Sequence, residues 1–341
     1  MKKTLTVFVS LLLLAAALGV SAVAVAPKPP KPPPPPPPAG TIYFQYDDGT
    51  GVAVWTMKAD GSEKTKLPVD PCPEEYPSFG VVSRIKHGDH YWFVRACEIA
   101  GEYYPDGRVR KELFAVRDDN AGGLQLTGDP SLALPTVFIG WGIDDVTISW
   151  VAMRWVCDPD CHITEGGLYD ATVSYDTGGN IIGLGTPSLI LSSDIICTTF
   201  CRPSISYFDW SPDGSKVVLT RWGDSGPKIY VVDLASSSET YLSTGTSPQW
   251  SPDGSKIAFI AHPDLKTINP DGSGETTLVA GRTGKRSSWV SDLAWSPDGN
   301  HLVYEWVAEG RIGLQCDIYR IGVDGSGNTH LSEGYQHLAW R

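Results

Sequence analysis

Two closely spaced pairs of cysteines carry the most distinctive chemistry in this chain of 341 residues. Cys157 and Cys161 enclose Asp-Pro-Asp, and Cys197 and Cys201 enclose Thr-Thr-Phe. This spacing favours two local disulfides, although pairing among four cysteines stays open from sequence alone. A metal site made from the four thiolates and His162 is the alternative, because three-residue spacers occur among zinc ligands. The tighter two-residue spacing of zinc knuckles is missing, so we expect disulfides and no metal or other cofactor.

The remaining three cysteines are Cys72, Cys97 and Cys316. Cys72 and Cys97 flank one predicted structural unit and form a third candidate disulfide. Cys316 is then left without a partner.

Signatures of catalysis are sparse. The segment 223–227, Gly-Asp-Ser-Gly-Pro, is similar to the nucleophile motif of trypsin-like proteases but is one glycine short and lacks the accompanying histidine segment. The sequence contains no H-E-x-x-H, no phosphate loop and no G-x-S-x-G. Acidic, glycine-rich stretches at 47–49 and 269–272 lack the alternating oxygen ligands of an EF-hand. Turns explain all these segments more simply.

A repeated pentapeptide indicates which structural elements would position a functional site. Trp-Ser-Pro-Asp-Gly begins at Trp210, Trp250 and Trp295, so the copies are 40 and 45 residues apart. Pro and Asp-Gly favour a tight turn, and an apolar run follows each copy. The Trp gives the preceding strand a large group to bury. Each copy therefore predicts a β-hairpin.

One complete unit predicts four strands, which we call a, b, c and d in chain order. They cover 206–210, 216–222, 228–234 and 240–242. Two weaker units run over 76–127 and 137–191, with a strands ending in Phe79 and Trp141. Four strands in about 40 to 50 residues form the blade of an all-β propeller.

The two ends of the predicted fold carry complementary fragments. The segment 335–340 is an a strand without a successor, whereas Thr41–Phe44 begins a unit at its b strand. Pairing the two would close the ring and protect both sheet edges. The a-strand aromatics then predict six blades, with seven as the alternative: Phe79, Trp141, Trp210, Trp250, Trp295 and Trp340.

The strings WSPDGSK and IYVVDL resemble the TolB-type propeller repeat, a WD-like repeat of periplasmic proteins. The resemblance covers 41–340 and is strongest in the second half. TolB itself has an additional α/β domain before its propeller, and no equivalent is expected here. The resemblance therefore implies a fold and an envelope location but not the role of TolB in the Tol–Pal system.

Propeller geometry assigns the turns to two faces. The a–b and c–d turns, which include every SPDG sequence, lie on what we call the turn face. The b–c and d–a connections lie on the loop face, where long loops are expected at 97–110, 157–167, 192–202 and 307–316. The a strands begin at that face, around the mouth of a central channel. Candidate binding residues there are Glu75, Tyr76, Tyr207, Ser247, Asp292 and His337.

These features predict a non-catalytic module that binds a protein or another ligand through the channel mouth and the cysteine-bearing loops. The alternative is a polysaccharide lyase or hydrolase in which His337 and Asp292 carry protons. Lyases with related propellers exist, and this resemblance supports the alternative.

The first 24 residues have two lysines, an apolar core and an Ala-x-Ala end, which predict a Sec signal peptide. An uncleaved anchor is the alternative. Residues 25–40 include seven consecutive prolines and predict a polyproline II spacer before a propeller at 41–341. The protein is therefore expected in the periplasm or outside the cell.

The net charge is −12, and no basic cluster is expected. An acidic surface argues against nucleic acid and against anionic membranes as partners. An envelope or secreted protein, or a glycan, is the expected partner, and the protein is expected to be a monomer whose mature domain does not insert into a membrane.

Overall fold

The computed structural model divides into two units, Met1–Pro36 and Pro37–Arg341, and only the second is described here. The predicted signal peptide and most of the spacer lie outside the described residues, as do Cys72, Glu75 and Tyr76. The described part contains strands and turns and no helix that could cross a membrane. It comprises residues 39–49, 52–67, 83–87, 90–104, 107, 109–117, 124–128, 132–133, 139–141, 146–157, 161–197, 201–311 and 313–340.

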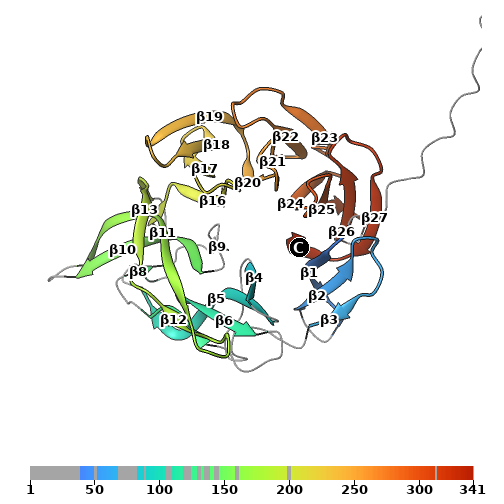
Figure 1. Ribbon diagram of the computed structural model, residues 1–341. Helices are drawn as coiled ribbons and strands as arrows, with labels where there is room; N and C mark the ends of the chain where they lie inside the picture. The colour runs from blue at the N-terminus through green and yellow to red at the C-terminus, as the bar shows by residue number, and fades with distance from the viewer. Residues whose placement is uncertain are drawn as a thin grey trace, which may run out of the picture. The chain divides into compact units, whose positions relative to one another are not determined.

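The described strands form six antiparallel blades around a centre, as predicted, and not the seven of the alternative (Figure 1). The blades that follow the pentapeptide repeat have the predicted a–b–c–d order. Their strands are β16 (Ile205–Trp210), β17 (Lys216–Gly223), β18 (Gly226–Asp233) and β19 (Ser238–Thr244), then β20 (Thr246–Trp250), β21 (Ile257–Ala261), β22 (Asp264–Ile268) and β23 (Thr276–Val279), then β24 (Ser288–Trp295), β25 (His301–Glu309), β26 (Leu314–Gly322) and β27 (Thr329–Glu333).

The first and last strands of the described part meet in one blade, which confirms the predicted closure. The C-terminal strand β28 (Tyr335–Trp340) pairs with β1 (Thr41–Asp47), and β2 (Val52–Lys58) and β3 (Thr65–Lys66) complete the sheet. Ile42 lies opposite Trp340, whose Nε1 donates a hydrogen bond to the carbonyl of Ala39 at 3.3 Å. Trp340 is 3% exposed and packs with Ile42 and Phe44 against the neighbouring blade. The apolar core thus lies between adjacent blades.

The second blade departs from the prediction. Its strands are β4 (Ser83–His87), β5 (His90–Tyr103), β6 (Val109–Arg117) and β7 (Leu124–Gln125), and β4 occupies the a position. We predicted that strand at 76–79, ending in Phe79, a segment that lies outside the described residues. The pairing of His87 with His90 leaves only Gly88-Asp89 between the strands, a dipeptide typical of two-residue hairpins. The repeat motif was absent here, so its aromatic residue misled the assignment.

The third blade keeps its predicted a, b, c and d strands and gains two short ones. These are β9 (Ile139–Trp141), β10 (Thr147–Cys157), β11 (Cys161–Tyr175) and β13 (Ser188–Ser192), with β8 (Leu132–Ala133) and β12 (Ile181–Leu184) added. A separate pair, β14 (Ile195–Cys197) and β15 (Cys201–Pro203), follows.

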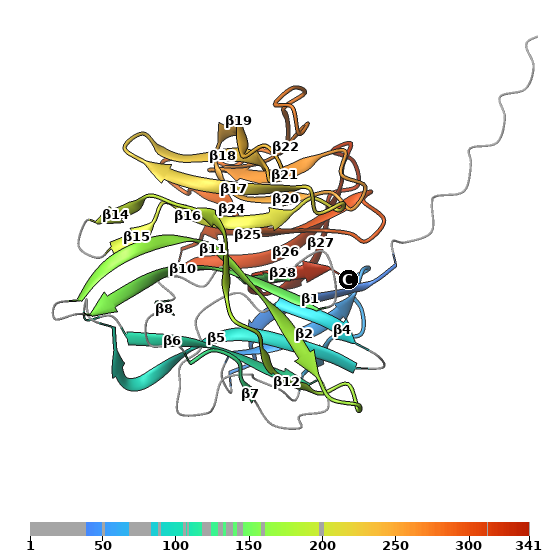
Figure 2. The ribbon, with the colours of Figure 1, turned by 60° about the vertical axis from the view of Figure 1, so that its left-hand side comes forward.

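The predicted long loops of the loop face are largely strands. β5 and β6 extend across most of 97–110, β11 begins at Cys161, and β25 and β26 leave only 310–313 between them. The β10–β11 and β25–β26 ladders continue through these segments, which pairs their backbone groups. The β5–β6 ladder resumes at Tyr103 and Val109 after an irregularity that begins at Glu98. Figure 2 shows the β10–β11 hairpin beside the β14–β15 pair, and both of its strands contact β15.

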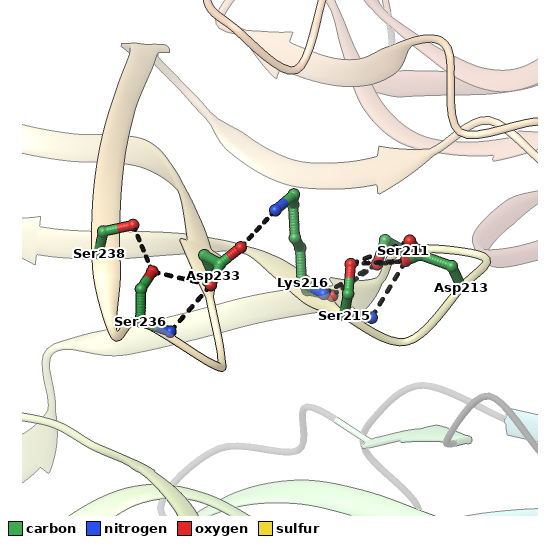
Figure 3. A network of polar contacts seen from close by, with 7 residues as sticks. All are labelled: Ser211, Asp213, Ser215, Lys216, Asp233, Ser236 and Ser238. Carbon is green, nitrogen blue, oxygen red and sulfur yellow. Dashed lines mark hydrogen bonds and ion pairs between the residues drawn. The ribbon is translucent and has the colours of Figure 1, made fainter.

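Each SPDG turn closes through the same hydrogen bonds. In the first copy the Ser211 hydroxyl donates to Asp213 at 2.6 Å and accepts from the amide of Lys216 at 2.9 Å (Figure 3). Asp213 also accepts from the amide of Ser215 at 3.0 Å. These bonds hold the pKa of Asp213 down to about 2, the Ser211 bond having the largest effect. The pentapeptide is therefore architectural.

Candidate functional site at the start of the innermost strands

The candidate site lies on the a strands β16, β20 and β24, which contact one another in sequence around the ring (Figure 1). Tyr207, Ser247 and Asp292 each stand three residues before the tryptophan that ends the strand. The pairing with the b strand shifts register at or directly beside each of these residues. Such β-bulges redirect side chains and are frequent beside functional sites.

The backbone is strained at two of these positions. Tyr207 has φ +43° and Ser247 has φ +53°, in the left-handed region that favours glycine. A conformation of this kind persists only where the surrounding structure enforces it, and it concentrates at binding and active sites. The blades therefore hold the two side chains in a fixed and unusual direction.

The phenol of Tyr207 interacts with one side chain from each of the next two blades. The Tyr207 hydroxyl hydrogen-bonds with Ser247, and the Asp292 carboxylate is close enough to act on the phenol electrostatically. Burial raises the pKa of Tyr207, the Asp292 charge raises it further, and the Ser247 hydrogen bond opposes both. Tyr207 nevertheless remains 37% exposed. The phenol therefore stays protonated at neutral pH and is accessible as a hydrogen-bond donor.

Asp292 also holds the ring together. One carboxylate oxygen accepts from the amide of Leu338 in β28 at 2.9 Å, and the other accepts from the amide of Leu293 at 2.8 Å. Asp209 in β16 makes a similar bond across another blade boundary, accepting from the amide of Trp250 in β20 at 2.7 Å. The carboxylate of Asp292 is thus an inter-blade tie as well as part of the candidate site.

A set of buried polar residues on the b strands, next to the a strands, was not predicted from the sequence. Glu305 is 2% exposed, accepts from the Ser291 hydroxyl, and lies opposite Asp292. Thr220 and Gln45 occupy the same b-strand register in two other blades and are also buried. Among the described residues, the Thr220 hydroxyl and the Gln45 amide nitrogen have no hydrogen-bond partner. Single polar residues inside otherwise apolar b strands were the signal that could have revealed them.

The predicted site residues have different outcomes. The structure brings Tyr207, Ser247 and Asp292 together. The strand of His337 is described but its side chain is not, and Glu75 and Tyr76 lie outside the described residues. Their participation stays a prediction.

The cysteines are accounted for in part. Cys97 is buried and disulfide-bonded, and its partner is not among the described side chains. Cys316 is free, as expected for the leftover residue. Burial, followed by the Glu305 charge, raises the pKa of Cys316 to about 11, so it remains a thiol.

The two local cysteine pairs stand directly opposite each other across antiparallel strands. Cys157 faces Cys161 between β10 and β11, and Cys197 faces Cys201 between β14 and β15. Directly opposed residues in an antiparallel pair have Cα atoms about 4.5 to 5.5 Å apart, within the range that a disulfide bridges. The backbone is therefore compatible with both predicted disulfides.

Comparison with known proteins finds similarity in structure and not in sequence. No protein-family model and no curated protein sequence matches the chain. Among solved structures, TolB from Acinetobacter baumannii is similar with a TM-score of 0.58 and 14% identity, covering 90% of this chain and 67% of that one. A putative TolB from Agrobacterium tumefaciens has a TM-score of 0.50 and 16% identity, covering 89% and 92%.

These likenesses define the class of fold. The described residues form a six-bladed β-propeller of the TolB type, which confirms the fold that the repeat strings implied. At these identities the comparison extends to the fold alone, because one fold hosts many functions. Function has to be argued from the site.

Proposed function

We propose that this propeller is a non-catalytic binding module whose partner docks where the a strands begin. The observation that carries the proposal is the convergence of Tyr207, Ser247 and Asp292 from three consecutive blades. They present a phenol donor, a hydroxyl and carboxylate oxygens beside a partly exposed aromatic ring. A few convergent polar groups with aromatic surface are what fixes a ligand's orientation in a binding site.

The chemistry of the same residues favours binding over proton transfer. The raised pKa of Tyr207 makes the phenol a poor base at neutral pH. Asp292 accepts backbone amides on both oxygens and ties β24 to β28, so protonating it would weaken a blade boundary. Both groups are better suited to holding a ligand than to exchanging protons with it.

The proposed setting follows from the sequence. The protein is exported by the signal at 1–24, displayed on the spacer at 25–40 and stapled by disulfides on the loop face. Its partner is an envelope or secreted protein, or a glycan, which a monomeric propeller binds in the periplasm or outside the cell.

Capture experiments with the exported full-length protein test the proposal. Tyr207→Ala removes the ring and hydroxyl, and Tyr207→Phe removes the hydroxyl alone. Tyr241→Ala is the matched control, because Tyr241 is 50% exposed on the outer strand β19. We expect Tyr207→Ala to reduce the captured envelope partner by about tenfold, equivalent to about 1.4 kcal/mol. Equal capture by wild type and Tyr207→Ala would show that the partner docks elsewhere.

The enzyme alternative makes a separate prediction. A lyase or hydrolase that used His337 and Asp292 would degrade a polysaccharide, and His337→Gln would abolish turnover while leaving substrate binding intact. Depolymerisation by the wild-type protein, measured by viscosity or by new chain ends, would replace the binding proposal.

A further inference from the structure

The connection between β23 and β24 carries three basic residues, Arg282, Lys285 and Arg286, and we call residues 281–287 the basic loop. This loop corrects the expectation that the protein has no basic cluster. All three side chains belong to exposed residues. Among the described residues, none of the three forms an ion pair. Other lysines and arginines of the described part do, among them Lys58, Lys66, Arg110, Lys111, Arg154, Lys216, Arg221 and Lys266.

The base of the basic loop is firmly held. Arg282 and Ser288 exchange backbone hydrogen bonds at 2.7 and 3.0 Å. The amide of Gly281 donates to the carboxylate of Asp264 at 2.9 Å. A side chain at Gly281 would meet the carbonyl oxygens of Pro263 and Ser288 at 2.5 Å, so the two segments approach as closely as glycine allows. The loop is therefore pre-organised.

The loop is also tied to the adjoining turn of the next blade. The amide of Ser287 donates to the Glu309 carboxylate at 3.1 Å, and the amide of Glu309 donates to the Ser287 carbonyl at 2.9 Å. Arg311, a fourth exposed cation, lies two residues beyond Glu309. The acidic groups Asp264 and Glu309 thus bind the base of the loop, and Lys285 and Arg286 are left at its tip. Arg286 there has φ +60°, a second sign of enforced geometry.

The position of the loop relates it to the candidate site. It leads directly into β24, the strand that carries Asp292, and a d–a connection lies on the face where the a strands begin. A partner segment could bind at Tyr207, Ser247 and Asp292 and then run outward over the blade formed by β24–β27. Such a segment would reach the basic loop.

We propose that the basic loop binds an acidic peptide segment of the protein partner. This inference rests on the proposed function and specifies the partner's chemistry. Guanidinium groups pair with carboxylates through two parallel hydrogen bonds, and clusters of arginine are a recurrent means of recognising acidic motifs. A pre-organised loop loses little conformational entropy on binding. Because the net charge of the protein is −12, the rest of its surface would repel a long polyanion or an anionic membrane. The expected ligand is therefore a short acidic segment.

Fluorescence anisotropy with the full-length protein tests the inference. The probe is a short, labelled glutamate-rich peptide, compared with the same peptide carrying glutamine. We expect the glutamate peptide alone to bind, with an affinity that falls as salt is raised. The double variant Lys285→Ser, Arg286→Ser should weaken binding by about tenfold. Lys64→Ser is the matched control, since Lys64 is exposed on a turn of the opposite face, and it should change nothing.

The outcomes separate this inference from the binding module itself. Tyr207→Ala should leave binding of the glutamate peptide unchanged, because the peptide contacts the loop alone. Equal weakening by Lys64→Ser would mean non-specific attraction and would overturn the inference. It would also fail if the glutamate peptide did not bind at low salt, or if anionic vesicles or an acidic oligosaccharide bound the loop more tightly than the peptide.

Discussion

The two ends of each a strand behave differently. At the turn-face end, Trp250, Trp295 and Trp340 are at most 7% exposed. Three residues earlier, the strands bulge and carry a different side chain in each blade, Tyr207, Ser247 and Asp292 among them. Repetition of one residue type marks a position that packing dictates. The bulge also recurs, but the residue type there differs from blade to blade. Packing therefore does not dictate that residue, and the position is available for a function such as binding.

The largest effect should come from the closing tryptophan. Trp340→Ala removes a ring that is 3% exposed and seals the first blade, so it should lower the free energy of unfolding by about 3 to 5 kcal/mol. Tyr207→Ala, at the other end of an equivalent strand, should cost less than about 1.5 kcal/mol, because Tyr207 is partly exposed. Urea denaturation of both variants measures the difference. Similar losses would mean that both strand ends serve stability alone.

Two serine variants test the same difference between the two ends of the a strands, with expected stability losses of intermediate size. Ser211 is 4% exposed and bonds Asp213 and Lys216 within its turn, so Ser211→Ala should cost about 1 to 3 kcal/mol. Ser247→Ala removes one hydrogen bond at a partly exposed position and should cost less than about 1 kcal/mol. Chemical denaturation again provides the measurement. The reverse order would contradict the division between a structural and a functional strand end.

The sequence predicted most where the repeat is regular. Trp210 and Trp250 with their SPDG turns located every strand of their blades, and the fragments at 41–44 and 335–340 predicted the closed ring. In the second blade no SPDG turn was present to set the register, and an aromatic at Phe79 was taken for its substitute. Local turn chemistry was therefore the decisive information.

The site could be predicted in position but not in its connections. Placing the starts of the a strands around the mouth of the channel identified Tyr207, Ser247 and Asp292, because a repeat places equivalent residues around one axis. The buried Glu305 and the basic loop escaped notice, since their meaning depends on which strands and turns lie beside them. The long hairpins were read as loops because polar, glycine-containing strands lack the apolar alternation of a half-buried sheet.

The smallest expected effect is the response of the turn face to acid. Asp213 has a pKa of about 2 in the folded protein against an ordinary value of 3.8. Because the folded-state pKa is the lower one, its stabilising contribution is complete above about pH 4 and is lost as the pH falls toward about 2. Asp213→Asn keeps an acceptor oxygen but does not titrate, so its melting temperature should fall less steeply across this window.

Melting curves followed by circular dichroism from about pH 5 to about pH 2 make this measurement. Asp224→Asn is the control on the loop face, where the structure shows no hydrogen bond to the Asp224 carboxylate from any residue it describes. That variant should follow the wild type, because the substitution removes no hydrogen bond to a described residue. If both variants reduced the dependence of melting temperature on pH equally, general charge repulsion and not the SPDG turn would govern acid sensitivity. That result would contradict a specific stabilising role for the turn-face end of the strand.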